Sequence, residues 1–356
     1  MEILLNPHRG RGLPELRAGG LPRPVDDASE VSRRLAQCPV AAKTPLRDLS
    51  EMAAETGIAK LWLKDESGRM GLGSFKALGA AHAIAREAEL SGAEDLRTAL
   101  AGRSFVTASA GNHGLSVAAG AHVFGARAVI YLAETVPEAF ADRLRAKGAE
   151  VRRDGAVYED SMAAAARAAE TEGMTLLSDS SWPGYWELPL RVIEGYLQLA
   201  AEAAEELPEP PTHVLLQAGV GGLAAAVAAF ARARWGAAPK IVVVEPAYAP
   251  ALIESIRAGK IVTSAGPVST MGRLDCKDPS LLALAGLAED ADVFATIGEE
   301  EAQAAVEKLA TLGLATTPSG AAGLAGLLAA GPRHAALGLG PDSRVLAILS
   351  EGAEAP

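Results

Sequence analysis

The sequence alternates short runs of β-branched and other apolar residues with longer Ala-rich segments of helix-forming composition. Strands and helices that alternate in this way form βα units around parallel strands. The predicted strands are 61–63, 104–107, 128–132, 214–217, 241–244 and 345–349. The predicted fold class is therefore α/β.

Composition excludes several classes of protein. The chain has 356 residues, 49% of them hydrophobic, which is enough for a large buried core. Its formal net charge of -11 and the absence of a basic patch argue against a nucleic-acid partner. No basic leader and no apolar stretch of membrane-spanning length are seen, so we expect a cytoplasmic protein with no membrane partner. Cys38 and Cys276 lie far apart, which indicates plain thiols and no metal site.

Two segments depart from the regular pattern. The first 27 residues are rich in Gly, Pro and Arg, which predicts an irregular arm laid over a surface or a partner subunit. Residues 209–212 lie among prolines and predict a short rigid connector between the helical segment 192–206 and the next strand.

Lys76 stands where a Gly-rich turn leads from a strand into a helix. Its neighbours Phe75, Ala77 and Leu78 are apolar. Burial among such residues lowers the pKa of a lysine and favours the neutral amine that forms a Schiff base. A solvated lysine is the alternative that these residues leave open.

Two further turns could bind anions. Ser109, Ala110, Gly111, Asn112 and His113 follow a predicted strand and precede a predicted helix, so their backbone N–H groups would lie at a helix N-terminus and could hold a carboxylate. Asn112 adds a side-chain amide, whereas His113 is more typical of a packed or capping residue. An ordinary βα turn with permissive glycines is the alternative.

The second turn contains Gly219, Val220, Gly221, Gly222 and Leu223, in a setting suited to a phosphate. Gly219, Gly221 and Ala224 also satisfy a relaxed dinucleotide fingerprint, and Glu245 ends the next strand where a ribose-binding acid is expected. These residues alone therefore leave a nicotinamide-dependent oxidoreductase open.

The motifs occur together in one order. Ser74-Phe75-Lys76 is followed by residues 109–113, 219–223, Pro318-Ser-Gly-Ala-Ala322 and Leu349-Ser-Glu-Gly352. This order resembles the fold-type II pyridoxal-phosphate enzymes, the tryptophan synthase beta-like fold. The resemblance implies two open twisted parallel-sheet domains with pyridoxal 5′-phosphate between them. It also implies that Lys76 holds the cofactor, Asn112 contacts the ring hydroxyl, residues 219–223 hold the phosphate and Ser350 faces the pyridine nitrogen.

Residues 179–185, Pro189 and Glu194-Gly-Tyr196 resemble in particular the diaminopropionate ammonia-lyase branch. That branch carries an aspartate, thought to take the α-proton of D-substrates, where this chain has Ala110, and the turn instead resembles threonine dehydratase. We therefore expect L-configured substrates and Lys76 as the base. Thr317 stands where dehydratases commonly carry an acid. Asp179 is a candidate for recognising a second amino group or protonating the leaving group, with helix capping or loop bracing as the alternative.

The resemblance predicts a lyase that eliminates a β-substituent from a small L-amino acid, such as 2,3-diaminopropionate or a β-hydroxy amino acid, to give a 2-keto acid and ammonia. It further implies a homodimer, a large domain of residues 1–83 and 175–356, and a small mobile substrate-binding domain of residues 84–174. A β-replacement synthase of the cysteine-synthase kind, the oxidoreductase, and a non-catalytic cofactor-binding protein remain as alternatives.

Overall fold

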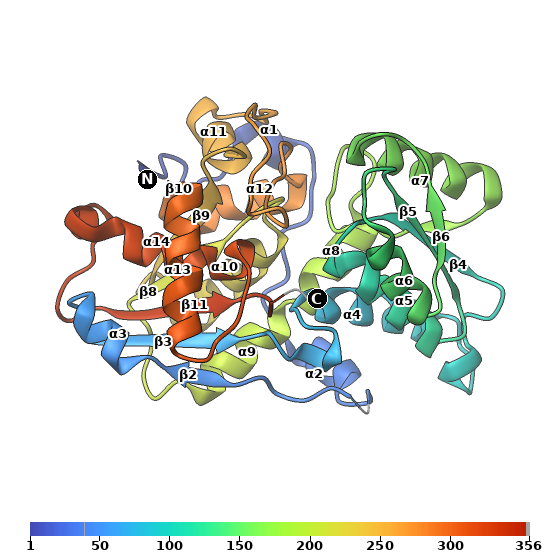
Figure 1. Ribbon diagram of the computed structural model, residues 1–356, viewed down its shortest axis with the longest axis horizontal. Helices are drawn as coiled ribbons and strands as arrows, with labels where there is room; N and C mark the ends of the chain where they lie inside the picture. The colour runs from blue at the N-terminus through green and yellow to red at the C-terminus, as the bar shows by residue number, and fades with distance from the viewer. Residues whose placement is uncertain (39, 354–356) are drawn as a thin grey trace.

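The computed structural model describes residues 1–38 and 40–353 and contains two sheets in two lobes (Figure 1). The strands are β1 Glu2–Leu5, β2 Leu46–Asp48, β3 Lys60–Asp65, β4 Ser104–Ala108, β5 Arg127–Leu132, β6 Glu150–Arg153, β7 Thr175–Leu176, β8 His213–Gln217, β9 Lys240–Pro246, β10 Val293–Ile297 and β11 Arg344–Leu349. The helices are α1 Pro14–Ala18, α2 Ser29–Leu35, α3 Ser50–Glu55, α4 Lys76–Leu90, α5 Asn112–Val123, α6 Glu138–Ala146, α7 Tyr158–Glu172, α8 Glu187–Gly195, α9 Leu197–Glu206, α10 Gly222–Trp235, α11 Ala251–Ala258, α12 Leu281–Asp290, α13 Glu299–Thr311, α14 Pro318–Ala330 and α15 His334–Leu337.

The larger sheet has the order β1-β10-β9-β8-β11-β3-β2. Its inner strands, from β10 to β3, pair in parallel, and the two edge strands β1 and β2 pair antiparallel. Side chains alternate between its faces: Ile241 and Val243 of β9 pack in the core that contains α10 and α12, whereas Val242 and Val244 pack against α13 and α14. Helices therefore cover both faces, which explains why these strands are apolar throughout.

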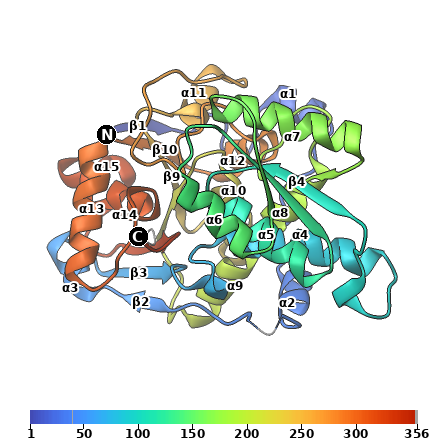
Figure 2. The same cartoon turned by 45° about the vertical axis from the view of Figure 1, so that its right-hand side comes forward.

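The smaller sheet has the order β6-β5-β4-β7 and is parallel throughout. Phe105 and Ile130 face α5 within the core shared with the larger lobe, whereas Val106 and Val129 pack against α7. Figure 2 shows α7 on one side of this sheet and α5 and α6 on the other. The predicted α/β class with two parallel sheets is confirmed.

The prediction of an irregular N-terminal arm is wrong in two places, because residues Pro14–Ala18 form helix α1 and a strand precedes them. Residues Glu2–Leu5 form β1, which pairs antiparallel with β10 through the register Glu2↔Thr296 to Leu5↔Val293. The short strand Val293–Ile297 was also absent from the predicted set, so its edge partner could not be anticipated. The helical segment 192–206 is interrupted at Tyr196, which separates α8 from α9.

Except for the segment Pro318–Ala322, which follows helix α13, the predicted motifs named above as candidate site segments lie on stretches that leave the carboxyl ends of strands. They follow β3, β8 and β11 in the larger sheet and β4 and β7 in the smaller one. Open parallel sheets bind ligands at such ends. No helix in the described ranges is long and apolar enough to cross a lipid bilayer.

Candidate active site

Lys76 is the first residue of α4, and its turn is joined to the segment after β11. The Phe75 N–H donates to the carbonyl of Ser350 at 3.1 Å, and the Gly352 N–H donates to the carbonyl of Gly73 at 3.0 Å. Because β11 and β3 are neighbours in the sheet, their carboxyl ends place Ser350 beside the turn that carries Lys76. Ser350 itself is buried.

The Lys76 ammonium donates a hydrogen bond to Asp179 Oδ2, which comes from the loop after β7. Burial lowers the pKa of Lys76, but the charge of Asp179, the Tyr196 phenol and the hydrogen bond to Asp179 raise it, so the pKa lies above its ordinary value. Burial likewise raises the pKa of Asp179, but Lys76 and His113 lower it well below its ordinary range. The prediction of a lowered lysine pKa is therefore wrong, because sequence reasoning did not place Asp179 next to the amine.

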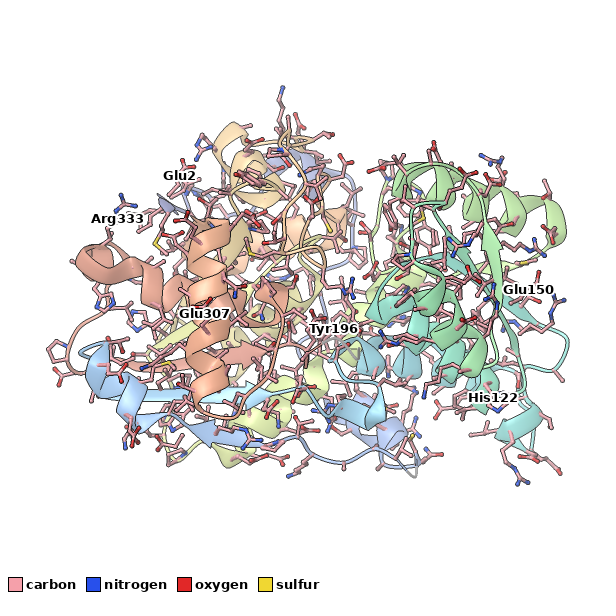
Figure 3. All side chains as sticks on the ribbon, viewed as in Figure 1. Glu2, His122, Glu150, Tyr196, Glu307 and Arg333 are labelled. Atoms are coloured by element: carbon pink, nitrogen blue, oxygen red, sulfur yellow. The ribbon has the colours of Figure 1, made fainter. Side chains whose placement is uncertain are left out.

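The aromatic ring of Tyr196 packs against Phe75 and Lys76. Its ring meets Phe75 edge to face at a centroid distance of 4.8 Å, and Lys76 Nζ lies 5.8 Å from the Tyr196 centroid. Burial raises the pKa of the phenol to about 12. Figure 3 places Tyr196 at the junction of the two lobes, whereas the labelled His122 and Glu150 lie in the outer part of the smaller lobe.

A close helix crossing makes room for this ring. A Cβ on Gly195 of α8 would lie 2.4 Å from the Leu78 carbonyl oxygen, and a Cβ on Gly79 of α4 would lie 2.6 Å from Tyr196 Cε1. Only glycine at both positions lets α4 and α8 approach this closely. The crossing therefore fixes the start of α4 relative to Tyr196.

The glycine loop after β8 leads directly into α10. Gly221 has a φ of +97°, a conformation that favours glycine. Within the described ranges, no hydrogen-bond acceptor is recorded for the backbone N–H groups of Gly219, Gly221, Gly222 and Leu223. Amides of this kind at the N-terminus of a long helix can hold an anion.

The start of this loop is held tightly. Gln217 Nε2 donates to the carbonyls of Gly320 and Ile348, each at 3.0 Å. A Cβ on Gly219 would lie 3.0 Å from both Cys276 Sγ and Leu274 Cα, so the loop backbone passes close against the segment 274–276. This cradle fits a phosphate group, and burial raises the pKa of the neighbouring Cys276 thiol to about 12.

The turn after β4 presents a second set of amides. Ser109 Oγ accepts from the N–H groups of Gly111 at 3.3 Å and Gly114 at 3.1 Å. Among the residues that the structure describes, no acceptor is recorded for the N–H groups of Ala110, Asn112 and His113. The His113 ring is buried, and its Nε2 lies 2.8 Å from the Leu177 carbonyl, so it packs as the sequence indicated.

A carboxylate that sequence reasoning did not single out completes this region. Glu351 is 6% exposed, accepts from Asn112 Nδ2 and Thr317 Oγ1, and has Arg273 Nε at 3.9 Å from Oε2. It borders a cavity of about 340 Å³ whose lining includes Arg273 and Thr317.

The sequence contained signals for part of what was missed. Glu351 and Tyr196 stand inside the quoted motifs Leu349-Ser-Glu-Gly352 and Glu194-Gly-Tyr196, but neither received a role. Arg273 and Cys276 belong to the irregular stretch between α11 and α12, which has no periodic pattern from which its position could be predicted.

Glu245 does not serve a dinucleotide. Its carboxylate is fully buried and accepts from the N–H groups of Leu252 at 2.7 Å and Ile253 at 2.8 Å, at the start of α11. The interpretation of Glu245 as a ribose-binding acid is therefore wrong, since the carboxylate binds the amides of α11 inside the protein.

Comparison with known proteins gives consistent matches. The profile of the family described as "Pyridoxal-phosphate dependent enzyme" matches residues 38–351. A diaminopropionate ammonia-lyase of Salmonella typhimurium is 34% identical over 68% of this chain and 65% of its own length, and that of Escherichia coli is 34% identical over 87% and 84%. The Escherichia coli enzyme with an aminoacrylate-PLP azomethine reaction intermediate superposes with a TM-score of 0.88 at 30% identity, covering 99% of this chain and 93% of that chain.

Proposed function

The chain belongs to the pyridoxal-phosphate dependent enzyme family, and on that premise we propose that it is an ammonia-lyase acting on a small L-amino acid. It eliminates the β-substituent and releases a 2-keto acid and ammonia. Family membership confirms the predicted cofactor, and the similarity to diaminopropionate ammonia-lyases bears out the predicted lyase class. The observation that carries the proposal is the position of Lys76, whose amine meets Asp179 in a region bordered by the two sets of free amides.

The residues around Lys76 suit the cofactor. Lys76 would hold it as a Schiff base, the loop 219–223 would hold its phosphate, Asn112 would contact its ring hydroxyl and Ser350 would face its ring nitrogen. When bound, the cofactor delocalises the electron pair freed at the α-carbon of the substrate. A hydroxyl partner at the ring nitrogen leaves that nitrogen largely neutral.

The turn after β4 would bind the substrate carboxylate. The free N–H groups of Ala110, Asn112 and His113 lie at the start of α5, where an anion is stabilised. Gly111 would contribute shape and not a hydrogen bond, since Ser109 already occupies its N–H. With its carboxylate held there, the substrate would present its α-proton to the Lys76 amine, which acts as the base once it is released from the cofactor.

Asp179 would recognise the leaving group. Its carboxylate pairs with the free Lys76 ammonium, and once Lys76 held the cofactor the same carboxylate would be available to a second ammonium group on the substrate. The names of the relatives agree with a diamino acid substrate. Ala110 has no carboxylate that could act as a second base. Its presence at this turn favours L-configured substrates with Lys76 as the base.

The test is an assay of ammonia and 2-keto acid with L-2,3-diaminopropionate, L-serine and L-threonine, comparing the wild type with Lys76→Ala. Release of both products by the wild type alone supports the lyase. A new amino acid formed on addition of a thiol would instead indicate β-replacement. Turnover of the D-isomers at a comparable rate would contradict the assignment of Lys76 as the single base.

We also propose that the protein is a cytoplasmic homodimer and that the part of the chain from 84 to 174 moves to close over the substrate. The resemblance supports both ideas. Sedimentation of the purified protein tests the dimer, and small-angle scattering with and without substrate tests the closure.

A further inference from the structure

The Glu351 carboxylate joins the two lobes at the active site. The residue follows Ser350 directly, and its backbone is fixed by a β-bridge to Ser74 and by the Thr316 hydroxyl, which donates to the Glu351 carbonyl at 2.5 Å. The side chain therefore has a defined direction, toward Asn112 at the start of α5. Asn112 is the residue proposed above to contact the cofactor ring hydroxyl.

We infer that Glu351 is a positioning residue that orients the Asn112 carboxamide for the cofactor, an inference that rests on the proposed function. An ionised carboxylate can only accept hydrogen bonds, whereas a carboxamide has a donor side and an acceptor side. Glu351 therefore selects the rotamer in which Nδ2 faces the carboxylate, because the flipped amide would place Oδ1 against Oε2. Nδ2 carries a second N–H, which this rotamer leaves available to donate to the ring oxygen.

Thr317 contacts the second carboxylate oxygen of Glu351. Its hydroxyl accepts from the Gly320 N–H at 3.0 Å as the N-cap of α14 and donates to Glu351 Oε1. Both oxygens of Glu351 are thus tied to groups of fixed direction, and the positive charge of Arg273 lies 3.9 Å away from Oε2. Thr317, the residue before Pro318, is not acidic, but its hydroxyl contacts the carboxylate of Glu351, which follows β11.

A double-mutant cycle tests whether Glu351 acts through Asn112. The quantity measured is the Kd of pyridoxal phosphate, by titration of the visible absorption of the protein, for the wild type, Glu351→Ala, Asn112→Ala and the double variant. We expect Glu351→Ala to weaken binding by about tenfold, the scale of one hydrogen bond to a charged group. The double variant should bind no more weakly than Asn112→Ala alone, because coupled residues are not additive.

The inference is overturned if the losses of affinity caused by the two substitutions add. It is also overturned if Glu351→Ala weakens binding and Asn112→Ala does not. Urea unfolding of the cofactor-free variants shows whether each is folded. If Glu351→Ala does not fold, Glu351→Gln is used in its place. The neutral amide of that variant can present either side to Asn112, so its visible spectrum should change with pH differently from that of the wild type. An unchanged pH profile of the spectrum would also count against the inference.

The control is Asp342→Asn, an exposed change at the opposite end of β11, which should leave both the Kd and the spectrum unchanged. Failure of this inference can be distinguished from failure of the proposed function. A wild-type protein that never binds pyridoxal phosphate contradicts the proposed function itself. Additive losses in a protein that does bind it contradict only the role of Glu351.

Discussion

Lys76 and Asp179 form a hydrogen-bonded ion pair although they are separated by 103 positions in the chain. The pair joins the first residue of α4 to the loop after β7, so it links the two sheets at their carboxyl ends. It also sets the protonation state of the lysine, because Asp179 stabilises the ammonium in a buried setting.

Replacing Asp179 with Asn should make Lys76 easier to deprotonate. Without the carboxylate, burial dominates and lowers the pKa of the amine, so the neutral form that reacts with an aldehyde is present at lower pH. The rate at which pyridoxal phosphate develops its visible band should then reach its midpoint about one pH unit lower or more. Asp342→Asn, an exposed change at the opposite end of β11, is the control. An unshifted rate profile would show that Asp179 does not govern the lysine.

Gly219→Ala should weaken phosphate binding. The added methyl would lie 3.0 Å from Cys276 Sγ and Leu274 Cα, so the loop must move from its position at the start of α10. We expect the Kd of pyridoxal phosphate to rise about tenfold, the cost of one or two misplaced amide hydrogen bonds. Pyridoxal, which lacks the phosphate, is the matched ligand and should bind both proteins alike. Equal losses for the two ligands would argue against a phosphate at this loop.

Gly195→Ala should destabilise the protein, although alanine is ordinarily the better helix former. The new Cβ would lie 2.4 Å from the Leu78 carbonyl oxygen, which forces α8 away from α4. Overpacking of this kind lowers the free energy of unfolding by about 1–3 kcal/mol. Gly340→Ala, where a Cβ meets nothing within 4 Å, should be nearly neutral. Urea unfolding of both variants measures the difference, and a stabilised Gly195→Ala would contradict the close crossing.

Glu245→Gln should remove a pH dependence of stability. Burial raises the pKa of Glu245 to about 8, above the value for an unfolded chain. The unfolded chain therefore loses this proton at lower pH than the folded protein does, and the free energy of unfolding falls as pH rises through that interval. The wild type should lose more stability than Glu245→Gln between about pH 5 and about pH 8. Parallel pH profiles of urea unfolding would show that Glu245 already ionises at its ordinary pKa.

Local pattern predicted much of the fold. The strands around Leu61, Val106, Val129, Leu215, Val242 and Ala347 each contain the predicted run, because buried parallel strands need uninterrupted apolar residues. The short edge strand Glu2–Leu5 escaped prediction, since it depends on pairing with a strand almost 300 positions later and not on its own composition.

The candidate site was predicted as motifs and not as contacts. Lys76, Asn112 and the loop 219–223 carry recognisable sequence patterns and lie at strand ends as expected. The contacts of Asp179 with Lys76 and of Glu351 with Asn112 join distant segments, so no local periodicity could reveal them. That is why the sequence alone indicated the wrong direction for the pKa of Lys76.

The most direct test of the account is borohydride reduction of the protein loaded with pyridoxal phosphate, followed by peptide mapping by mass spectrometry. Reduction fixes a Schiff base permanently to the lysine that carries it. We expect a phosphopyridoxyl group on Lys76. Modification of another lysine in place of Lys76, or a protein that takes up no label, would contradict it.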